Sequence, residues 1–350
     1  MQRQAYQLKA GNLNNLQLVQ QELADPAPHE VQIDIRAIGL NFADIFAMWG
    51  LYSATPEGVF IPGLEYAGVI RAVGSAVEGH RVGDAVMGVT RFGAYATALN
   101  IDQRYALPLP AGWSFAEGAA YLVQVLTAYY ALVRLGDLRE GKTVLIHSAA
   151  GGVGLLANRI AKRYAAYTIG TVGHASKVDF CRQEGYDAVI VRSPNFAEDL
   201  RQALGDRELA LVMECIGGKV LEVGFEQLAP QGRMVVYGSA RYARRTDKPN
   251  YLRLLWQFLR RPKIDPQGLI QSNKGLLGFN LIWLYEKAEL MAEILTEVAA
   301  LGLEKPFVGH TFTFEQLPEA IRLFQSGTTM GKVVIDGFES HATSERKKST

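Results

Sequence analysis

The glycine-rich segment at residues 147–154 is the feature that most constrains the fold of this 350-residue chain. It reads HSAAGGVG, directly follows the apolar run TVLI, and directly precedes the helix-like stretch LLANRIAKRYAA. A glycine loop between a strand and a helix is the context of a dinucleotide site, because phosphates sit at the helix N-terminus where free N–H groups favour anions. Gly151 would let the backbone approach a pyrophosphate, and Gly154 would let the helix pack against the strand. Ala149 stands where the first glycine belongs, so a plain glycine turn is the alternative.

Six short apolar runs after Lys142 match the strand count of a doubly wound parallel sheet, and helical or polar stretches separate most of them. The chain before about Pro110 reads instead as short strands with frequent Gly, Pro and Asp, which is typical of a β-barrel or sandwich. Ser114 with Glu117 forms a capping-box pattern that predicts a helix of about twenty residues. The six runs are TVLIH, AYTIGTV, DAVIV, LALVMECI, GRMVVYG and LLGFN.

Composition excludes several classes of protein. Lys and Arg total 36 against 35 for Asp and Glu, a net charge of +1, which argues against a dedicated nucleic-acid binder. Cys181 and Cys215 are too few for a disulfide framework or a multi-cysteine zinc site, and they fit a reducing cytosol. The first residues lack a secretory signal, and the uncharged run at 118–133 is shorter than the ~20 residues of a membrane span. We expect a cytoplasmic protein of about two domains.

The stretch after the second strand indicates which nicotinamide cofactor would bind. NAD-preferring folds place an acid there to hold the ribose hydroxyl, and residues 171–177 (TVGHASK) contain none. Ser176 and Lys177 could hold a 2′-phosphate, and Arg192 after the third strand could join them. An ordinary solvated helix start is the alternative, but the missing acid favours NADPH.

Seven segments that follow one another along almost the whole chain are informative together. They are GLNFADIFAMWGLY (39–52), PGLEYAGVIRAVG (62–74), LTAYYAL (126–132), HSAAGGVG (147–154), ECIGG (214–218), GFNL (278–281) and GKVVID (331–336). The set resembles the zinc-free quinone oxidoreductases of the medium-chain dehydrogenase/reductase superfamily. GFNLIWL and the basic insert before it are especially similar to the branch that contains synaptic vesicle membrane proteins.

The resemblance implies an α/β chain in which a GroES-like β-barrel catalytic domain joins a Rossmann domain with a doubly wound parallel sheet. The catalytic domain would comprise residues 1–122 and 280–350, with 338–350 as a flexible tail. The NADPH-binding domain would comprise residues 123–279 and carry a basic insert at 241–263. The family also implies an active site in the cleft between the domains and a homodimer formed through the sheet edge near LLGFNLIWL.

The residues at the zinc positions of the superfamily point to a metal-free site. Zinc-containing members bind metal through a Cys near the GLNFAD position and a His in a G-H-E motif, and here these positions hold Asn41 and Leu64. Glu65 remains, but one carboxylate cannot close a zinc site, so we expect it to be structural. We expect surface or satisfied core positions for the six histidines, which show no ligand spacing. They are His29, His80, His147, His174, His310 and His341.

The family motif also carries over a set of site residues. Asn41 and Tyr52 would line the cleft, and Thr127 would lie near the nicotinamide. Tyr52 could donate a hydrogen bond or a proton to the developing oxyanion, or simply form an aromatic wall. Many relatives have a second tyrosine six residues earlier, where this chain has Phe46, so a mechanism needing that hydroxyl is in doubt. The expected cofactor contacts are Ala150, Gly151, Gly152, Val153, Gly173, Ser176, Lys177, Arg192, Tyr237, Ser239, Leu277, Phe279 and Lys332, with Glu214 structural.

The insert at 241–263 differs most from the rest of the chain in charge composition, with eight cations against the single acid Asp247. Its stretch YLRLLWQFLRR predicts a helix with Arg253, Gln257 and Arg260 on one stripe. Such a helix could lie on an anionic membrane surface, cap the cofactor domain or pack in a dimer.

Together these patterns predict a metal-independent, NADPH-dependent oxidoreductase that transfers hydride to quinones or α,β-unsaturated carbonyl compounds. Without a Lewis acid, the acceptor has to be electrophilic already. A 2-alkenal or enoyl-thioester reductase is a near alternative. A non-enzymatic NADPH-binding scaffold, docked on membranes through the insert, is an alternative from another class. The sequence leaves the physiological acceptor and the proton donor open.

Overall fold

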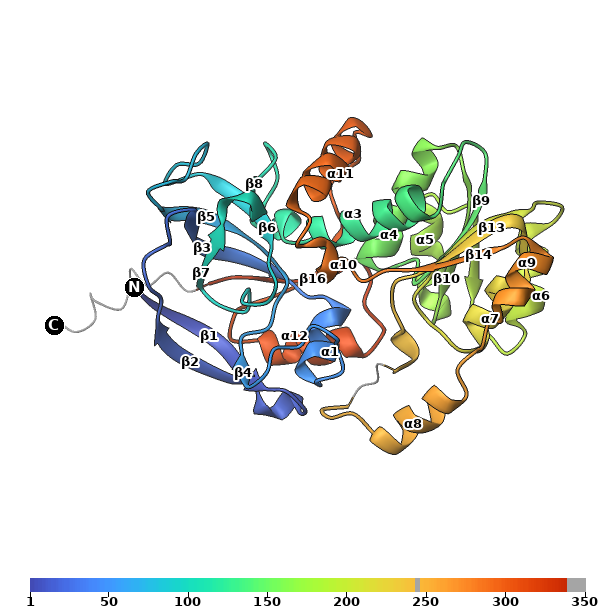
Figure 1. The fold of residues 1–350 in the computed structure, drawn as a ribbon, viewed down its shortest axis with the longest axis horizontal. Coiled ribbons are helices and arrows are strands. Elements are labelled where there is room, and N and C mark those ends of the chain that lie inside the picture. Colours follow the sequence, from blue (N-terminus) through green and yellow to red (C-terminus); the bar gives the residue numbers. More distant parts are fainter. Residues whose placement is uncertain (243–245, 339–350) are drawn as a thin grey trace.

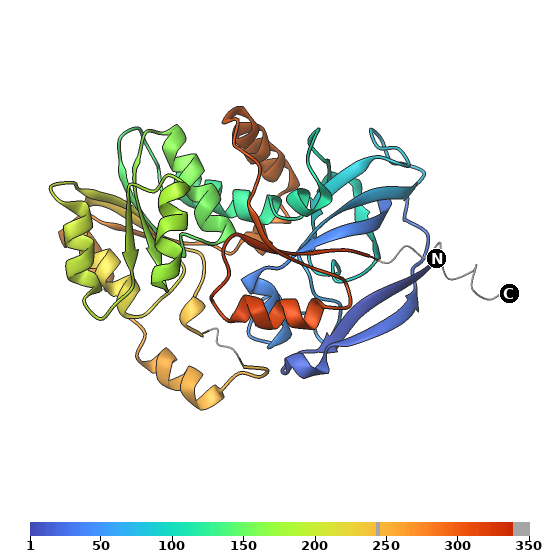
Figure 2. The same ribbon diagram turned by 180° about the vertical axis from the view of Figure 1, so that it is seen from behind.

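The computed structural model describes residues 1–242 and 246–338, which form two bodies side by side (Figure 1). The first is built around a seven-stranded sheet and a three-stranded sheet, and the second around a six-stranded sheet. Turning the molecule by half a turn shows α12 (Leu317–Gln325) and the last strands on the first body (Figure 2). The expected α/β fold, a GroES-like barrel with a Rossmann domain, is confirmed; the exact domain boundaries stay a prediction.

The second body contains the predicted doubly wound sheet. Its strands pair in parallel in the order β11-β10-β9-β12-β13-β14. All six apolar runs become strands, so this prediction is confirmed. They are β9 (Thr143–His147), β10 (Tyr167–Val172), β11 (Ala188–Val191), β12 (Leu209–Glu214), β13 (Leu228–Val236) and β14 (Gly275–Gly278).

Both faces of this sheet are buried because helices cover each of them. Along β9, Val144 and Ile146 pack in one core with Leu156, whereas Leu145 packs in a separate core with Leu200. Successive side chains of a strand point to opposite faces, so the same strand contributes to two cores. The helices around the sheet are α4 (Gly152–Arg163), α5 (Val178–Gln183), α6 (Phe196–Leu204), α7 (Lys219–Glu226) and α9 (Pro266–Ser272).

The first body combines the two ends of the chain. The final strand pairs antiparallel with β3, with Val334 opposite Gly39, and this pairing returns the C-terminal segment to the N-terminal sheet. The seven-stranded sheet contains β15 (Val308–Phe312), β16 (Lys332–Asp336), β3 (Glu30–Gly39), β5 (Glu65–Val73), β6 (Ala85–Val89), β7 (Ala98–Asp102) and β8 (Ala106–Pro108). The smaller sheet contains β1 (Gln2–Lys9), β2 (Gln17–Glu22) and β4 (Val59–Phe60).

The connection between the bodies contains the predicted helix of about twenty residues, because Phe115–Leu135 is a helical stretch of 21 residues with a break after its first turn. The capping box forms, with Ser114 and Glu117 bonded in both directions, and the first segment, α2 (Phe115–Gly118), ends at the break. The stretch continues as α3 (Leu122–Tyr129) and a π-helical segment, Tyr130–Leu135. By length and apolar composition Phe115–Leu135 could cross a membrane, yet 67% of its apolar window is buried inside the protein.

The insert forms the predicted helix, α8 (Tyr251–Leu259), but the residues of the predicted polar stripe differ in burial, because Arg260 is exposed and Arg253 half-buried. Gln257 is buried, and Arg241 donates to its carbonyl oxygen at 3.2 Å. The apolar side chains point outward instead, with Leu252 83% and Trp256 54% exposed. Residues 243–245 of the insert and 339–350 of the expected tail lie outside the described residues.

Candidate functional site

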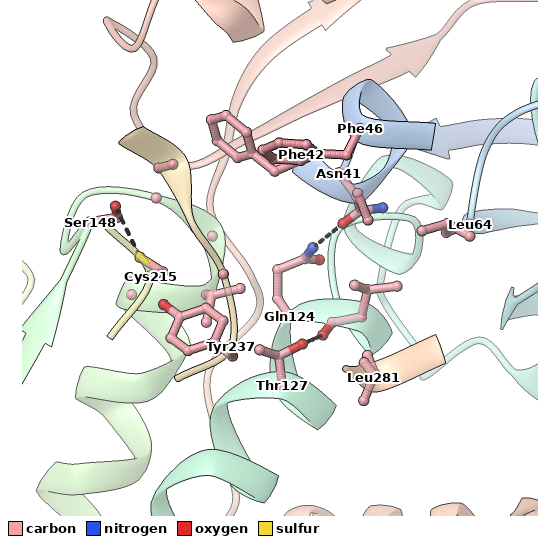
Figure 3. Close-up of a pocket in the computed structure, with 18 of the residues that line it drawn as sticks. Asn41, Phe42, Phe46, Leu64, Gln124, Thr127, Ser148, Cys215, Tyr237 and Leu281 are labelled. Carbon is pink, nitrogen blue, oxygen red and sulfur yellow. Dashed lines mark hydrogen bonds between the residues drawn. The ribbon is translucent and has the colours of Figure 1, made fainter. Parts of the chain in front are cut away.

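A cavity of about 1080 Å³ lies between the two bodies, and both contribute to its wall. On one side Asn41, Phe42 and Phe46 come from the start of α1 (Phe42–Met48), and on the other Ser148 and Tyr237 come from the cofactor sheet (Figure 3). α10 (Leu281–Leu284) and α11 (Ala288–Ala300) also line this cleft.

The glycine loop forms one end of the cavity. Gly151 is the N-cap of α4, and no side chain caps the N-terminus of this helix. A Cβ atom on Gly154 would lie 2.6 Å from the carbonyl oxygen of Ser148, so only glycine fits this close helix–strand approach. The loop is also tied to the C-terminal strand, because the Gly331 N–H donates to the Ala150 oxygen at 2.7 Å. Backbone N–H groups at a helix start and a loop free of side chains fit a pyrophosphate.

Most of the residues expected to contact the cofactor line this cavity. Two do not: Ser176 is exposed on the turn before α5, and Leu277 packs against the hydrophobic core. The residues that line the cavity are Ala150, Gly151, Gly152, Val153, Gly173, Lys177, Arg192, Tyr237, Ser239, Phe279 and Lys332.

The two cations proposed for a 2′-phosphate lie together but are partly engaged. Lys177 is buried, and its Nζ donates to the oxygens of Gly327 and Thr329, each at 2.7 Å. Burial, and then the nearby Arg192, lower the pKa of Lys177. Arg192 donates through Nη1 to Thr171, at 3.2 Å to its Oγ1. Lys177 is therefore held by carbonyl oxygens, whereas Arg192 has its second terminal nitrogen, Nη2, beside Gly173.

The three candidate catalytic residues all reach the cavity. The Thr127 hydroxyl donates to the Val123 oxygen one helical turn earlier, at 2.7 Å. The Tyr52 hydroxyl donates to Asn280 Oδ1 at 2.6 Å, across the cleft from the turn before α10. Asn41 Oδ1 accepts from the side chain of Gln124 (Figure 3). Thr127 therefore has no proton free for a ligand in this arrangement, whereas Tyr52 has one that a ligand could take over.

The ionisation state of Tyr52 suits a hydrogen-bond donor. Burial raises its pKa to about 12, although the hydrogen bond to Asn280 acts in the opposite direction. The hydroxyl therefore stays protonated at neutral pH. Phe46 also lines the cavity and packs edge-on against Trp49, with ring centroids 6.0 Å apart.

A buried polar cluster, which we call the Glu65 cluster, includes Asn41 and Glu65, two of the residues at the positions of the superfamily's zinc motif. It contains Glu65, Lys332, Asn41 and Gln124. Lys332 Nζ lies 2.9 Å from Glu65 Oε2 and 2.8 Å from Asn41 Oδ1, and Glu65 is fully buried. The carboxylate that remains from the zinc motif is thus already paired with an ammonium group. Within residues 1–242 and 246–338, no three His, Cys, Asp or Glu side chains come together as metal ligands.

Three of the residues near the site were not expected from the sequence. Asn280 and Gln124 bond to the predicted residues Tyr52 and Asn41. Gln124 Oε1 is buried and has no hydrogen-bond partner among the described residues. Asp44 is fully buried beneath Asn41, and burial raises its pKa to about 7. The capping position of Asp44, three residues after Asn41, is the one local signal that could have indicated it.

His147 is a fully buried core histidine. Its Nδ1 lies 2.8 Å from Thr171 Oγ1, and its Nε2 lies 3.2 Å from Glu214 Oε2. Glu214 also accepts from the N–H groups of Ile216 and Gly217, which fixes the loop after β12. Its contacts agree with the structural role expected for it.

The fold and the sequence both have known relatives. A family model described as an alcohol dehydrogenase GroES-like domain matches residues 27–111, and one described as a zinc-binding dehydrogenase matches residues 152–263. The chain is 33% identical over 310 residues to the synaptic vesicle membrane protein VAT-1 homolog of Danio rerio, covering 87% of this chain and 64% of that protein. It is 32% identical to the Rattus norvegicus homolog over 314 residues, covering 89% of this chain and 77% of that one. The quinone oxidoreductase of Salmonella typhimurium is 36% identical over 236 residues, which cover 66% and 71% of the two chains.

Solved structures show the same similarity over nearly the whole chain. The Escherichia coli quinone oxidoreductase complexed with NADPH has a TM-score of 0.82 at 29% identity, covering 96% of this chain and 100% of that one. The human VAT-1 homolog-like protein has a TM-score of 0.82 at 25% identity, covering 97% and 99%. The CurK enoyl reductase has a TM-score of 0.81 at 26% identity, covering 96% and 99%.

Proposed function

The chain belongs to the medium-chain dehydrogenase/reductase superfamily, as an oxidoreductase similar to its quinone oxidoreductases and enoyl reductases, and on this basis we propose that it reduces quinones or α,β-unsaturated carbonyl compounds with NADPH and without metal. The observation that carries the proposal is the cavity, which is continuous from the glycine loop to Tyr52. One end fits a dinucleotide and the other presents a protonated hydroxyl to a second ligand.

The residues at the glycine-loop end fit the cofactor. Gly151 and Gly152 leave room for phosphates at the start of α4. The buried, unpartnered Gln124 Oε1 fits an amide donor such as the carboxamide of a nicotinamide. When bound, NADPH would supply the hydride, and the protein would hold the acceptor against it.

Tyr52 is the proposed hydrogen-bond and proton donor. Hydride addition to a quinone or enone carbon leaves negative charge on the conjugated oxygen, and a proton completes the reduction. The Tyr52 proton now goes to Asn280 and would move to that oxygen, after which solvent would reprotonate the phenolate. The alternative, an aromatic wall without proton transfer, remains for Tyr52→Phe to test.

The metal-independent part of the proposal rests on the Glu65 cluster. A metal ion would have to displace Lys332 from Glu65 and would find only Asn41 and Leu64 where other ligands are needed. The match to the zinc-binding dehydrogenase model covers residues 152–263 and so does not include these positions. Stoichiometric zinc in the purified protein would contradict this part.

Cofactor preference is proposed to depend on Lys177 and Arg192. The 2′-phosphate would add charge-assisted hydrogen bonds to groups that lie in a cavity without a facing carboxylate among its described lining residues. We expect Arg192→Ala and Lys177→Ala each to weaken NADPH binding more than NADH binding. Equal losses for both cofactors would contradict the assignment.

Turnover is the direct test of the proposed function. Purified protein is mixed with NADPH under chelator, with an ortho-quinone and a 2-alkenal assayed in parallel and NADH as the control. NADPH oxidation supports the proposal, and the faster acceptor decides between a quinone reductase and a 2-alkenal or enoyl-thioester reductase. Tight NADPH binding without turnover of any acceptor would contradict the enzyme.

The outward face of α8 favours a second candidate, a scaffold docked on an anionic membrane. Leu252, Leu255 and Leu259 are 83%, 55% and 65% exposed, and Arg260 stacks on Trp256 with 4.6 Å to the ring centroid. Apolar side chains flanked by arginines suit the interface of an anionic bilayer. Co-sedimentation with phosphatidylserine vesicles tests it, with Leu252→Asp and Leu255→Asp as variants and neutral vesicles as the control.

The proposal also includes a homodimer and a cytoplasmic location. β14 is an edge strand, and its Leu276 is 37% exposed, so this edge is open to pairing. Light scattering of the purified protein would report a monomer if the dimer were wrong.

A further inference from the structure

The end of the cavity beyond Tyr52 and Thr127 is an apolar arm. We use this name for the part of the wall formed by the start of β5, the end of β6, α10 and α11. Met291 and Ile294 are nearly fully buried at its base, and Leu281 lies beside Thr127 (Figure 3). Its apolar lining includes Leu64, Val89, Leu281, Leu290, Met291 and Ile294.

No charged side chain lines this arm within the described part of the chain. The three cations of the cavity wall, Lys177, Arg192 and Lys332, lie at the glycine loop, at the strand ends beside it and in the Glu65 cluster. Among the residues that the structure describes, no carboxylate forms part of the wall. A charged group on the ligand would therefore lose its hydration in the arm without gaining a partner.

The hydroxyl groups near the arm are also engaged with the protein. Thr127 donates to the Val123 oxygen, and Thr90 donates to the Phe92 oxygen, both at 2.7 Å. Because these protons are already used, the arm offers few polar partners away from the Tyr52–Asn280 pair. Amide or phosphate groups of a thioester substrate would find few hydrogen-bond partners in this arm, whereas methylene groups would gain from burial against its apolar side chains.

We propose that the acceptor is a neutral amphiphile, whose electrophilic carbonyl head lies at Tyr52 and whose hydrocarbon chain lies along α10 and α11. This rests on the proposed function and names the substrate class of the same site. Each methylene buried in such an arm contributes about 0.8 kcal/mol, which corresponds to roughly fourfold in affinity. Selectivity should therefore rise with chain length until the arm is filled.

The test compares acceptors that share a head and differ in chain length. The 2-alkenals from butenal to decenal, and benzoquinone with and without a decyl chain, are assayed with NADPH below their micelle concentrations. We expect kcat/KM to rise by about threefold to fourfold per added methylene, mainly through KM, before it levels off. Saturated alkanols, which cannot be reduced, should inhibit competitively with the same trend.

A variant and a matched control locate the chain in the arm. Leu290→Asn puts an amide into the arm and should reduce the dependence on chain length, whereas Leu18→Asn makes the same change at an exposed position of β2 and should preserve it. The binding of alkanols, followed by thermal shift, gives the same comparison without turnover.

The outcomes separate this inference from the function on which it rests. If short acceptors are reduced and longer chains bring no gain in kcat/KM or alkanol affinity, the proposal of an apolar chain is wrong and the reductase stands. If no acceptor is reduced while alkanols still bind with a chain-length trend lost in Leu290→Asn, the reductase is wrong and the apolar ligand stands. Equal trends in the Leu290→Asn variant and native protein would place the chain elsewhere.

Discussion

Removing one partner of the buried Glu65–Lys332 pair should destabilise the protein more than removing both. The two charged atoms are 2.9 Å apart, and the side chains are 0% and 3% exposed. Loss of one partner from a buried pair costs about 3–5 kcal/mol because the other charge stays uncompensated, whereas replacing both is often close to neutral. We therefore expect Glu65→Gln and Lys332→Met each to lower the free energy of unfolding by about that amount, and the double variant to recover most of it.

The two single variants should also respond to pH in opposite directions. Burial raises the pKa of Glu65 and lowers that of Lys332, and each partner now limits the other's shift. In Lys332→Met the unpaired carboxyl has a folded pKa above its unfolded value, so stability falls as pH rises. In Glu65→Gln the unpaired ammonium has a folded pKa below its unfolded value, so stability falls as pH falls.

Urea unfolding of the native protein, both single variants and the double variant, each at two pH values, measures both effects. Lys219→Met is the matched control, because its ion pair with Glu222 is exposed on the surface and should contribute little. A cost for Lys332→Met no larger than that of the control, or the same pH trend in both single variants, would refute the reasoning.

Three further predictions concern single positions. Tyr52→Phe should lower kcat by about a hundredfold or more if the hydroxyl donates the proton. Asn280→Ala, which only releases that hydroxyl, should lower kcat less. Stopped-flow NADPH oxidation measures both variants, and an unchanged rate in Tyr52→Phe contradicts the role. Burial raises the pKa of Asp44 to about 7, so the folded state binds more protons than the unfolded state between about pH 4 and 7. The free energy of unfolding should therefore fall as pH rises through that window. In a series of unfolding curves at different pH values, Asp44→Asn should make this fall smaller. Gly154→Ala would place a methyl group 2.6 Å from the Ser148 oxygen and should weaken NADPH binding, which a fluorescence titration measures. An affinity equal to that of the native protein would show that the loop can shift without loss of cofactor binding.

The sequence predicted those parts of the fold that depend on local pattern. The six strand segments and the glycine loop were recognisable because apolar runs, turn residues and a helix start lie within a few positions of one another. The capping box of Ser114 was correct for the same reason. The helix of about twenty residues after it also forms, over Phe115–Leu135, but the sequence pattern did not indicate its break after Gly118 or its π-helical segment.

The contacts that define the site were beyond a local pattern. Tyr52 and Asn280 are 228 positions apart, and Lys332 and Asn41 are 291 apart. The return of the last strand to β3 brings Lys332 to Asn41, and the meeting of the two bodies at the cleft brings Asn280 to Tyr52. Its position after the second strand pointed to Lys177, which lines the cavity, but its bonds to Gly327 and Thr329 depend on a loop of the other body. Nothing near α8 in sequence shows that Gln257 faces inward while its leucines face outward, because an amphipathic pattern fixes the faces of a helix and not its partner.

The distribution of charge in the cleft explains why the proposed reaction needs an acceptor that is already electrophilic. Each cation of the wall has protein partners: Lys332 has Glu65, Lys177 has two carbonyl oxygens, and Arg192 has Thr171. A cofactor with several phosphate charges still gains from these groups and from the N–H groups of the loop, whereas a single carbonyl oxygen at Tyr52 meets a neutral donor. A neutral donor stabilises a developing oxyanion less than a metal ion does, so the remaining stabilisation has to come from conjugation within the acceptor itself. Quinones and enones have that conjugation and simple ketones do not, and the apolar arm then selects among the conjugated acceptors by the chain they carry.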